Sequence, residues 1–149
     1  MVISFCGHAD FLKNEKYEET LINFLKDKVG NRHADLLLGG YGSFDAFAYD
    51  CAKKYQNTHP NVSLVYVTPY LDNEKNLRYQ SERYDMVLYP ELELVPKKLA
   101  IVYRNRFMIN KADVVVAYVS HSFGGAYGAY IYAKKIGKEI FNLAECHFE

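Results

Sequence analysis

Four short segments rich in glycine, histidine, serine and threonine each follow an apolar run, and they are where this chain could do chemistry. They cover residues 7–10, 39–43, 68–70 and 120–125. Two of them contain glycine pairs directly before a predicted helix: 39–43 is Gly-Gly-Tyr-Gly-Ser, and 120–125 is Ser-His-Ser-Phe-Gly-Gly. Glycine permits positive φ, and its missing Cβ lets a phosphate approach backbone N–H groups at the positive end of a helix. The two glycine loops therefore predict binding of a phosphate-bearing ligand, the alternative being that they only form tight turns.

Side chains near these loops could add charge and hydrogen bonds. Asp45 lies in the first turn of a predicted helix, where a carboxylate either accepts a ribose hydroxyl or complements the helix dipole, an effect of about 0.3–1 kcal/mol. Arg104 could hold a phosphate through two parallel hydrogen bonds, although arginine late in a helix also suits the dipole. His8 and His121 could donate to phosphate or act as acid or base, or could simply order their own loops.

The candidate ligand-binding residues lie directly after a predicted strand or on a helix that leads into one. They are Gly7, His8, Gly39, Gly40, Tyr41, Gly42, Ser43, Asp45, Arg104, Ser120, Gly124 and Gly125. The chain has neither a full Gly-x-Gly-x-x-Gly fingerprint nor a Gly-Lys-Ser/Thr ending, so ordinary dinucleotide binding and P-loop ATPase activity are not supported. The three cysteines are far apart and lack the paired spacing of a zinc site or a disulfide framework. We predict no metal and no cofactor.

Apolar runs alternate with amphipathic segments along the whole chain. We expect strands at 2–6, 34–38, 62–67, 86–89, 112–119 and 139–143, and helices at 13–29, 44–55, 71–84, 96–110 and 126–136. The strands lack period-two alternation, which is typical of a parallel sheet covered on both faces. The sequence therefore predicts one α/β domain over residues 1–149. It is a doubly wound, mainly parallel Rossmann-like sheet with helices on both faces and the glycine loops on adjacent strand ends.

Composition limits the partners. Lys plus Arg number 18 and Asp plus Glu number 18, so the formal net charge is zero and the positive excess of general nucleic-acid binders is absent. No apolar run approaches the roughly 20 residues that span a bilayer, and the first residues do not resemble a secretory signal. We expect a cytoplasmic protein that binds a small molecule, without general nucleic-acid binding and without a membrane partner.

The motifs and their order resemble the SLOG superfamily, which joins the SMF/DprA-type proteins, the Lonely-Guy phosphoribohydrolases and many small bacterial or phage proteins of unknown role. The segments that carry the resemblance are Phe5-Cys6-Gly7-His8, Leu38-Gly39-Gly40-Tyr41-Gly42, Arg104-Asn105-Arg106-Phe107-Met108, Ala112-Asp113 and Gly124-Gly125-Ala126. The resemblance covers nearly the whole chain. It implies a Rossmann-like fold that binds a nucleotide or a nucleotide-derived ligand at its strand ends, and it makes a homodimer plausible.

The chain departs from the enzymatic branch of that superfamily. Its pattern has Arg-Lys-x-x-Met and then Pro-Gly-Gly-x-Gly-Thr-x-x-Glu; here Asn105 replaces the lysine, Phe123 replaces the proline, and residues 127–131 contain no carboxylate. A carboxylate would stabilise the positive charge that develops on ribose when an N-glycosidic bond breaks. The first hypothesis is therefore a binding module or sensor. The alternatives are a phosphoribohydrolase that uses Asp45, Glu91 or Glu93 instead, and a protein-interaction domain with a vestigial site.

Overall fold

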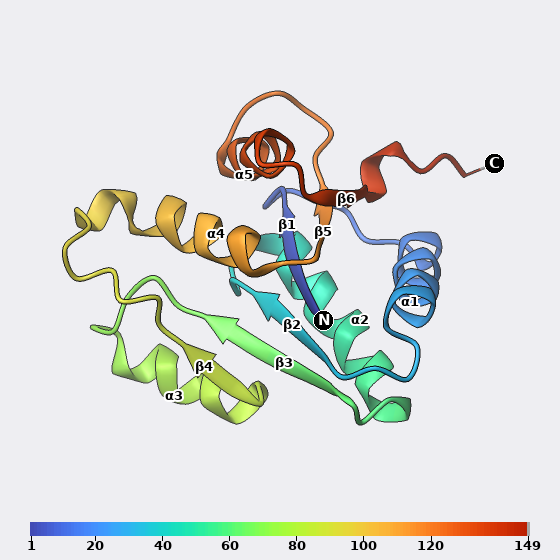
Figure 1. Cartoon of the computed structure of the whole chain (residues 1–149), viewed down its shortest axis with the longest axis horizontal. Coiled ribbons are helices and arrows are strands. Elements are labelled where there is room, and N and C mark those ends of the chain that lie inside the picture. Colours follow the sequence, from blue (N-terminus) through green and yellow to red (C-terminus); the bar gives the residue numbers. More distant parts are fainter. Residues whose placement is uncertain (149) are drawn as a thin grey trace.

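The computed structural model describes residues 1–148, which form a parallel sheet covered by helices (Figure 1). The strands are β1 (Val2–Gly7), β2 (Ala34–Leu38), β3 (Val62–Val67), β4 (Met86–Leu88), β5 (Val114–Tyr118) and β6 (Glu139–Asn142). The helices are α1 (Glu15–Val29), α2 (Gly42–Thr58), α3 (Glu74–Arg83), α4 (Ala100–Lys111) and α5 (Gly125–Lys135), with short 3₁₀ turns at Lys97–Leu99 and Leu143–Glu145. The predicted fold class and the order of elements are confirmed. The boundaries differ by a few residues, most at the start of α4, where a 3₁₀ turn takes the place of the first predicted turn.

All strand pairs are parallel, in the order β4-β3-β2-β1-β5-β6. The chain moves from β1 outward to β4, then returns to pair β5 with the other side of β1. The strand order therefore reverses between β1 and β5, and ligands of open α/β sheets bind outside the carboxyl ends of the strands at such a point. The sequence prediction that the two glycine loops follow adjacent strands is wrong, because β1 lies between β2 and β5.

Alternate residues of each strand face opposite layers of the core. Leu36 and Leu38 pack with α1 and α2 residues such as Leu21 and Phe44, whereas Leu37 packs against Met108 of α4. α1 contacts α2 on one side, and α4 contacts α5 on the other. The central strands β2, β3 and β5 are apolar at nearly every position because both of their faces are covered.

Candidate functional site

A pocket of about 420 Å³ lies beyond the carboxyl ends of β1, β2 and β5. Its walls come from the loops after those three strands and from one face of α4. The residues that line it are Phe5, Cys6, Gly7, His8, Ala9, Asp10, Gly39, Tyr41, Asp45, Ile101, Arg104, Asn105, Met108, His121, Phe123, Gly124, Gly125 and Ala126. Both predicted glycine loops thus meet one cavity, on either side of β1.

The structure brings together eight of the twelve predicted residues: Gly7, His8, Gly39, Tyr41, Asp45, Arg104, Gly124 and Gly125. Gly40, Gly42, Ser43 and Ser120 do not line the pocket. Gly40 and Gly42 have positive φ and lie so close to Tyr66 and Ala9, respectively, that a Cβ would overlap them. These two glycines serve the sharp turn into α2 and its packing.

The first glycine loop uses its polar groups within the fold. The Tyr41 amide donates to Asp45 Oδ2 at 3.1 Å, and the Ser43 amide donates to the Ala9 carbonyl at 3.2 Å. The Ser43 hydroxyl lies within hydrogen-bond distance of the Ala9 and Phe11 carbonyls. The two Ser43 bonds tie the start of α2 to the loop after β1, and the Tyr41 and Ser43 amides of this loop are therefore committed within the fold.

The second glycine loop has unused donors. α5 begins after Gly124, which has a φ of 91° and no side-chain cap. Among residues 1–148, the amides of Gly124, Gly125 and Ala126 donate to no protein acceptor, and all three residues line the pocket. A Cβ built on Gly124 or Gly125 would meet no heavy atom within 4 Å, so the backbone is approachable here. This helix end therefore has the positive potential and the open backbone that an anion needs.

Arg104 is the cation of the pocket, and only 4% of it is exposed. Its Nη1 donates to the Gly39 and Val67 carbonyls at 3.1 and 2.9 Å, and its Nε donates to Asn105 Oδ1 at 2.9 Å. Nη2 donates to no described residue. Burial lowers the pKa of Arg104, and the charge of Asp45 raises it. The guanidinium nevertheless stays charged throughout the physiological pH range. Arg104 therefore offers an unsatisfied, preoriented donor.

Asp45, in the first turn of α2, is a buried carboxyl that lines the same pocket. Burial raises its pKa to about 6, against the lowering effects of the Tyr41 amide and of Arg104. Cys6, which also lines the pocket, is protonated at neutral pH because burial and the Asp45 charge raise its pKa to about 12. Of the carboxylates proposed as substitutes for the missing glutamate, Glu91 and Glu93 lie outside the pocket lining.

His8 is 4% exposed and orders the second glycine loop. Its Nε2 accepts hydrogen bonds from the amides of Ser120 at 3.1 Å and His121 at 3.4 Å. The His8 ring stacks on His121 at 3.5 Å, and His121 stacks on Phe123 at 3.9 Å between ring centroids. Ser120 thus supports the site through His8 rather than by lining it.

Three residues of the α4 wall were missing from the sequence prediction. Ile101, Asn105 and Met108 line the pocket together with Arg104. Their spacing of i, i+3, i+4 and i+7 places all four on one helix face, so the sequence contained the signal. His121, which the sequence offers as a donor or an acid or base, also lines the pocket, as do Asp10 and Phe123 of the predicted segments 7–10 and 120–125.

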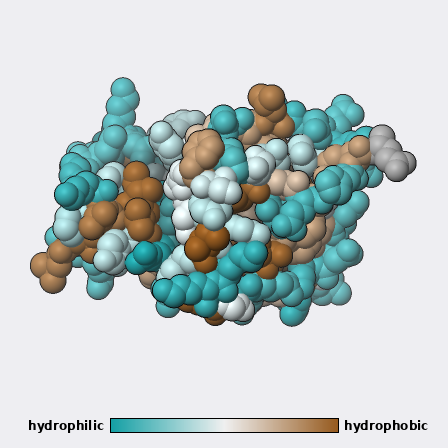
Figure 2. All heavy atoms as spheres, turned by 90° about the horizontal axis from the view of Figure 1, so that it is seen from above, coloured by the Kyte–Doolittle hydropathy of each residue, from teal (hydrophilic) through white to brown (hydrophobic). Residues whose placement is uncertain are grey.

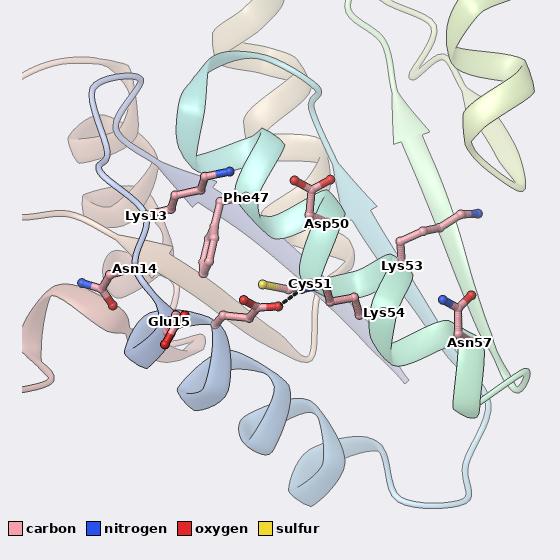
Figure 3. Close-up of a pocket in the computed structure, with 10 residues that line it drawn as sticks. Lys13, Asn14, Glu15, Phe47, Asp50, Cys51, Lys53, Lys54 and Asn57 are labelled. Carbon is pink, nitrogen blue, oxygen red and sulfur yellow. Dashed lines mark hydrogen bonds and ion pairs between the residues drawn. The ribbon is translucent and has the colours of Figure 1, made fainter.

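A second pocket, of about 490 Å³, lies between α1 and α2 (Figure 3). Its lining mixes both signs of charge, with Lys54 paired to Glu18 and with Lys13 and Asp50 nearby. None of the predicted site residues lines it.

Comparison with known proteins supports the fold. No family model and no curated protein matches the sequence. DNA processing protein A from Helicobacter pylori, a protein described as having a unique single-stranded DNA binding mode, superposes with a TM-score of 0.64 at 19% identity over 95% of this chain and 64% of its own. The structural-genomics target TM1055 superposes with a TM-score of 0.56 at 13% identity, over 93% of this chain and 71% of its own. DNA processing protein A from Streptococcus pneumoniae superposes with a TM-score of 0.52 at 13% identity, over 99% of this chain and 62% of its own.

These likenesses confirm the predicted Rossmann-like fold. The chain spans less than two thirds of either DNA processing protein. They also overturn one expectation: exclusion of nucleic acid from the zero net charge is wrong, because a protein of this fold is described as binding single-stranded DNA. Net charge sums the whole surface, whereas binding depends on local groups. No helix among residues 1–148 is long and apolar enough to cross a membrane.

Proposed function

We propose that the chain binds the phosphate of a nucleotide or nucleotide-derived small molecule in the pocket beyond β1, β2 and β5. The observation that carries the proposal is the meeting of two donor groups on one cavity: the uncapped start of α5 at Gly124–Ala126 and the unsatisfied Nη2 of buried Arg104. Oriented amides and a guanidinium are the usual partners of phosphate. Tyr41 and Phe123, which are 74% and 69% exposed at the same pocket, offer ring faces for a base.

Calorimetric titration with AMP and with adenosine tests this proposal. We expect AMP to bind at least about tenfold more tightly than adenosine, because a charged hydrogen bond contributes about 1.5–3 kcal/mol. Gly125→Glu should abolish AMP binding, since it puts a carboxylate at the anion position while suiting the first turn of α5.

Gly128→Glu is the matched control, because it adds the same charge to α5 in open space outside the pocket lining. It should bind AMP like the wild type. Equal affinities for AMP and adenosine, or normal AMP binding by Gly125→Glu, would contradict the proposal.

Hydrolysis of the N-glycosidic bond is a second candidate function, favoured by the buried carboxyl of Asp45 with its pKa of about 6. Incubation with AMP followed by chromatography tests it. Release of adenine by the wild type and its loss in Asp45→Asn would establish the enzyme. A binding module would leave AMP intact.

Single-stranded DNA is a further ligand class, favoured by the exposed rings of Tyr41 and Phe123 and by the single-stranded DNA binding described for the Helicobacter pylori protein. The pocket lining has one cation, Arg104, and two carboxyl groups, Asp10 and Asp45. This charge balance favours one nucleotide over a long polyanion. Fluorescence anisotropy with labelled oligo(dT) tests whether the chain binds single-stranded DNA. Loss of that binding in the double variant Tyr41→Ala, Phe123→Ala would assign the DNA site to this pocket.

We propose that a second copy of the chain covers the exposed apolar side chains at the start of α4. Figure 2 shows hydrophobic residues gathered at the left end of this face, over the first half of α4 and the turn before it. The exposed large apolar and aromatic side chains of residues 94–103 are Leu94, Leu99, Ile101, Val102 and Tyr103. Glu91 and Glu93 precede these side chains, and Lys98 and Arg106 lie among or after them, so the segment carries both signs of charge. Because a twofold interface pairs a patch with itself, this composition allows opposite charges to meet across it.

Light scattering tests this pairing. We expect a dimer for the wild type and a monomer for Val102→Glu, because the substitution buries an unpaired charge in the interface. Leu12→Glu, at an exposed residue remote from α4 in sequence, is the control and should remain dimeric. A monomeric wild type would refute the pairing.

A further inference from the structure

The contacts of His8 set it apart from a ligand-binding histidine. Its Nε2 accepts from the amides of Ser120 and His121, so neutral His8 carries its proton on Nδ1. These amides belong to the connection between β5 and α5. Residues 120–124 lead directly into the start of α5, whose unused N–H groups belong to residues that line the pocket. His8 is thus the side chain through which the end of β1 fixes the anion-binding backbone.

The stacking of rings makes this arrangement dependent on the charge of His8. His8 and His121 are nearly parallel, with 9° between ring planes and 3.5 Å between centroids. The ring of Tyr118 stands perpendicular to that of His8, with 6.3 Å between ring centroids. Protonation of Nε2 would remove the acceptor for two amides and would place a positive charge against the neighbouring imidazole. Either change weakens the hold on the loop.

The charged and titratable groups around His8 come from several elements. His121 lies on the loop after β5 and Asp10 on the loop after β1, while Tyr118 ends β5 and Asp45, Cys6 and Arg104 line the same pocket. Burial lowers the pKa of His8, His121 lowers it further, and Asp10 raises it. The direction agrees with the hydrogen bonds, which require the neutral ring.

We propose that His8 is a positioning residue: its neutral imidazole holds the loop 120–124 and the start of α5 against the pocket, and its protonation releases them. The proposal rests on the proposed function for its consequence, because a released loop no longer presents the N–H groups of Gly124–Ala126 to a phosphate. Its structural part, the pH-dependent order of the loop, is independent of any ligand.

Amide hydrogen exchange tests the structural part. Between about pH 7.5 and about pH 5, corrected for intrinsic exchange, we expect protection of the Ser120 and His121 amides to fall at least about tenfold in the wild type. His8→Gln keeps an acceptor that does not titrate, so its protection should change less than about twofold. His33→Gln removes an exposed histidine at the other end of β2 and should behave like the wild type. Protection that is independent of pH in the wild type, or that falls equally in His8→Gln, would overturn the proposal.

AMP affinity tests the consequence for the site. His8→Phe keeps a ring but leaves two amides without an acceptor, so it should weaken AMP binding about tenfold at about pH 7.5. From about pH 7.5 to about pH 5, the wild type and His33→Gln should lose about tenfold more affinity than His8→Gln. Titration of the AMP phosphate is common to all three and cancels in the comparison.

The two readouts separate the two proposals. If the exchange result is as expected and AMP binds at neither pH, the proposed function fails and the positioning role of His8 is supported. If exchange differs among the variants but AMP affinity shows the same pH dependence in all of them, the link between His8 and the site is overturned.

Discussion

At the scale of single residues, burial decides what each polar group of the pocket can do. The sequence places His8 directly after a strand, Asp45 in the first turn of a helix and Arg104 late in a helix, and the structure shows that all three are buried and internally bonded. Their hydrogen bonds leave Arg104 Nη2 available and commit His8 Nε2. The same residue types on an open loop would have had no such division of roles.

The pKa of Asp45 gives a prediction about stability. Its folded-state pKa of about 6 lies above the ordinary 3.8, so the folded protein binds the proton more tightly, and stability is lost as pH rises through that window. Asp45→Asn removes this loss and keeps an oxygen for the Tyr41 amide. Since one pKa unit corresponds to about 1.4 kcal/mol, we expect a gain of about 1–3 kcal/mol at pH values near 8 that shrinks towards zero near pH 4.

Urea unfolding at several pH values measures this gain. Asp50→Asn, at an exposed position of the same helix, should show no comparable pH-dependent gain. A gain for Asp45→Asn that is the same at every pH would contradict the assigned cause.

At the scale of elements, the packing around a glycine shows whether the fold requires a residue without a Cβ at that position. Gly7 ends β1 beneath α2, and a Cβ there would lie 2.3 Å from the Phe44 ring. Gly128 lies exposed inside α5, and a Cβ there would meet nothing within 4 Å. The first glycine allows α2 to approach the sheet, whereas the second has no packing reason.

Alanine substitution at these two glycines should therefore have opposite effects. Gly7→Ala should destabilise the fold by about 1–3 kcal/mol, the usual cost of overpacking. Gly128→Ala should stabilise it by about 1 kcal/mol, because alanine is the better helix former. Thermal unfolding of the two variants beside the wild type checks both signs, and a destabilised Gly128→Ala would show that this glycine has another role.

At the scale of the whole molecule, the sheet order assembles the site. β1 lies between the strands that carry the two glycine loops, and the return from β4 to β5 brings α4 across the sheet to supply Arg104. Ligand binding should therefore stabilise the entire domain. At a concentration a hundredfold above its Kd, AMP should raise the free energy of unfolding by about 2.7 kcal/mol. This corresponds to a rise in Tm of several degrees.

Differential scanning fluorimetry with and without AMP measures this rise. Gly128→Glu should show the full shift and Gly125→Glu none. A wild type whose Tm is unchanged by millimolar AMP would count against a nucleotide site.

The sequence by itself determined the α/β class and the order of the elements. Of the four segments predicted to carry chemistry, 7–10, 39–43 and 120–125 contribute residues to the pocket, whereas 68–70 does not line it. Apolar strands buried on both faces and amphipathic helices leave a local pattern in the chain. The helical spacing of Ile101, Arg104, Asn105 and Met108 also indicates, from the sequence alone, that these four residues share one face of α4, and that face lines the pocket. Only the tertiary structure decided that the loops flank β1, that the Tyr41 and Ser43 amides of the first loop donate to Asp45 and Ala9, and that His8 accepts hydrogen bonds from the loop after β5. Those facts depend on strand order and on hydrogen bonds between residues up to 113 positions apart, which no local pattern records.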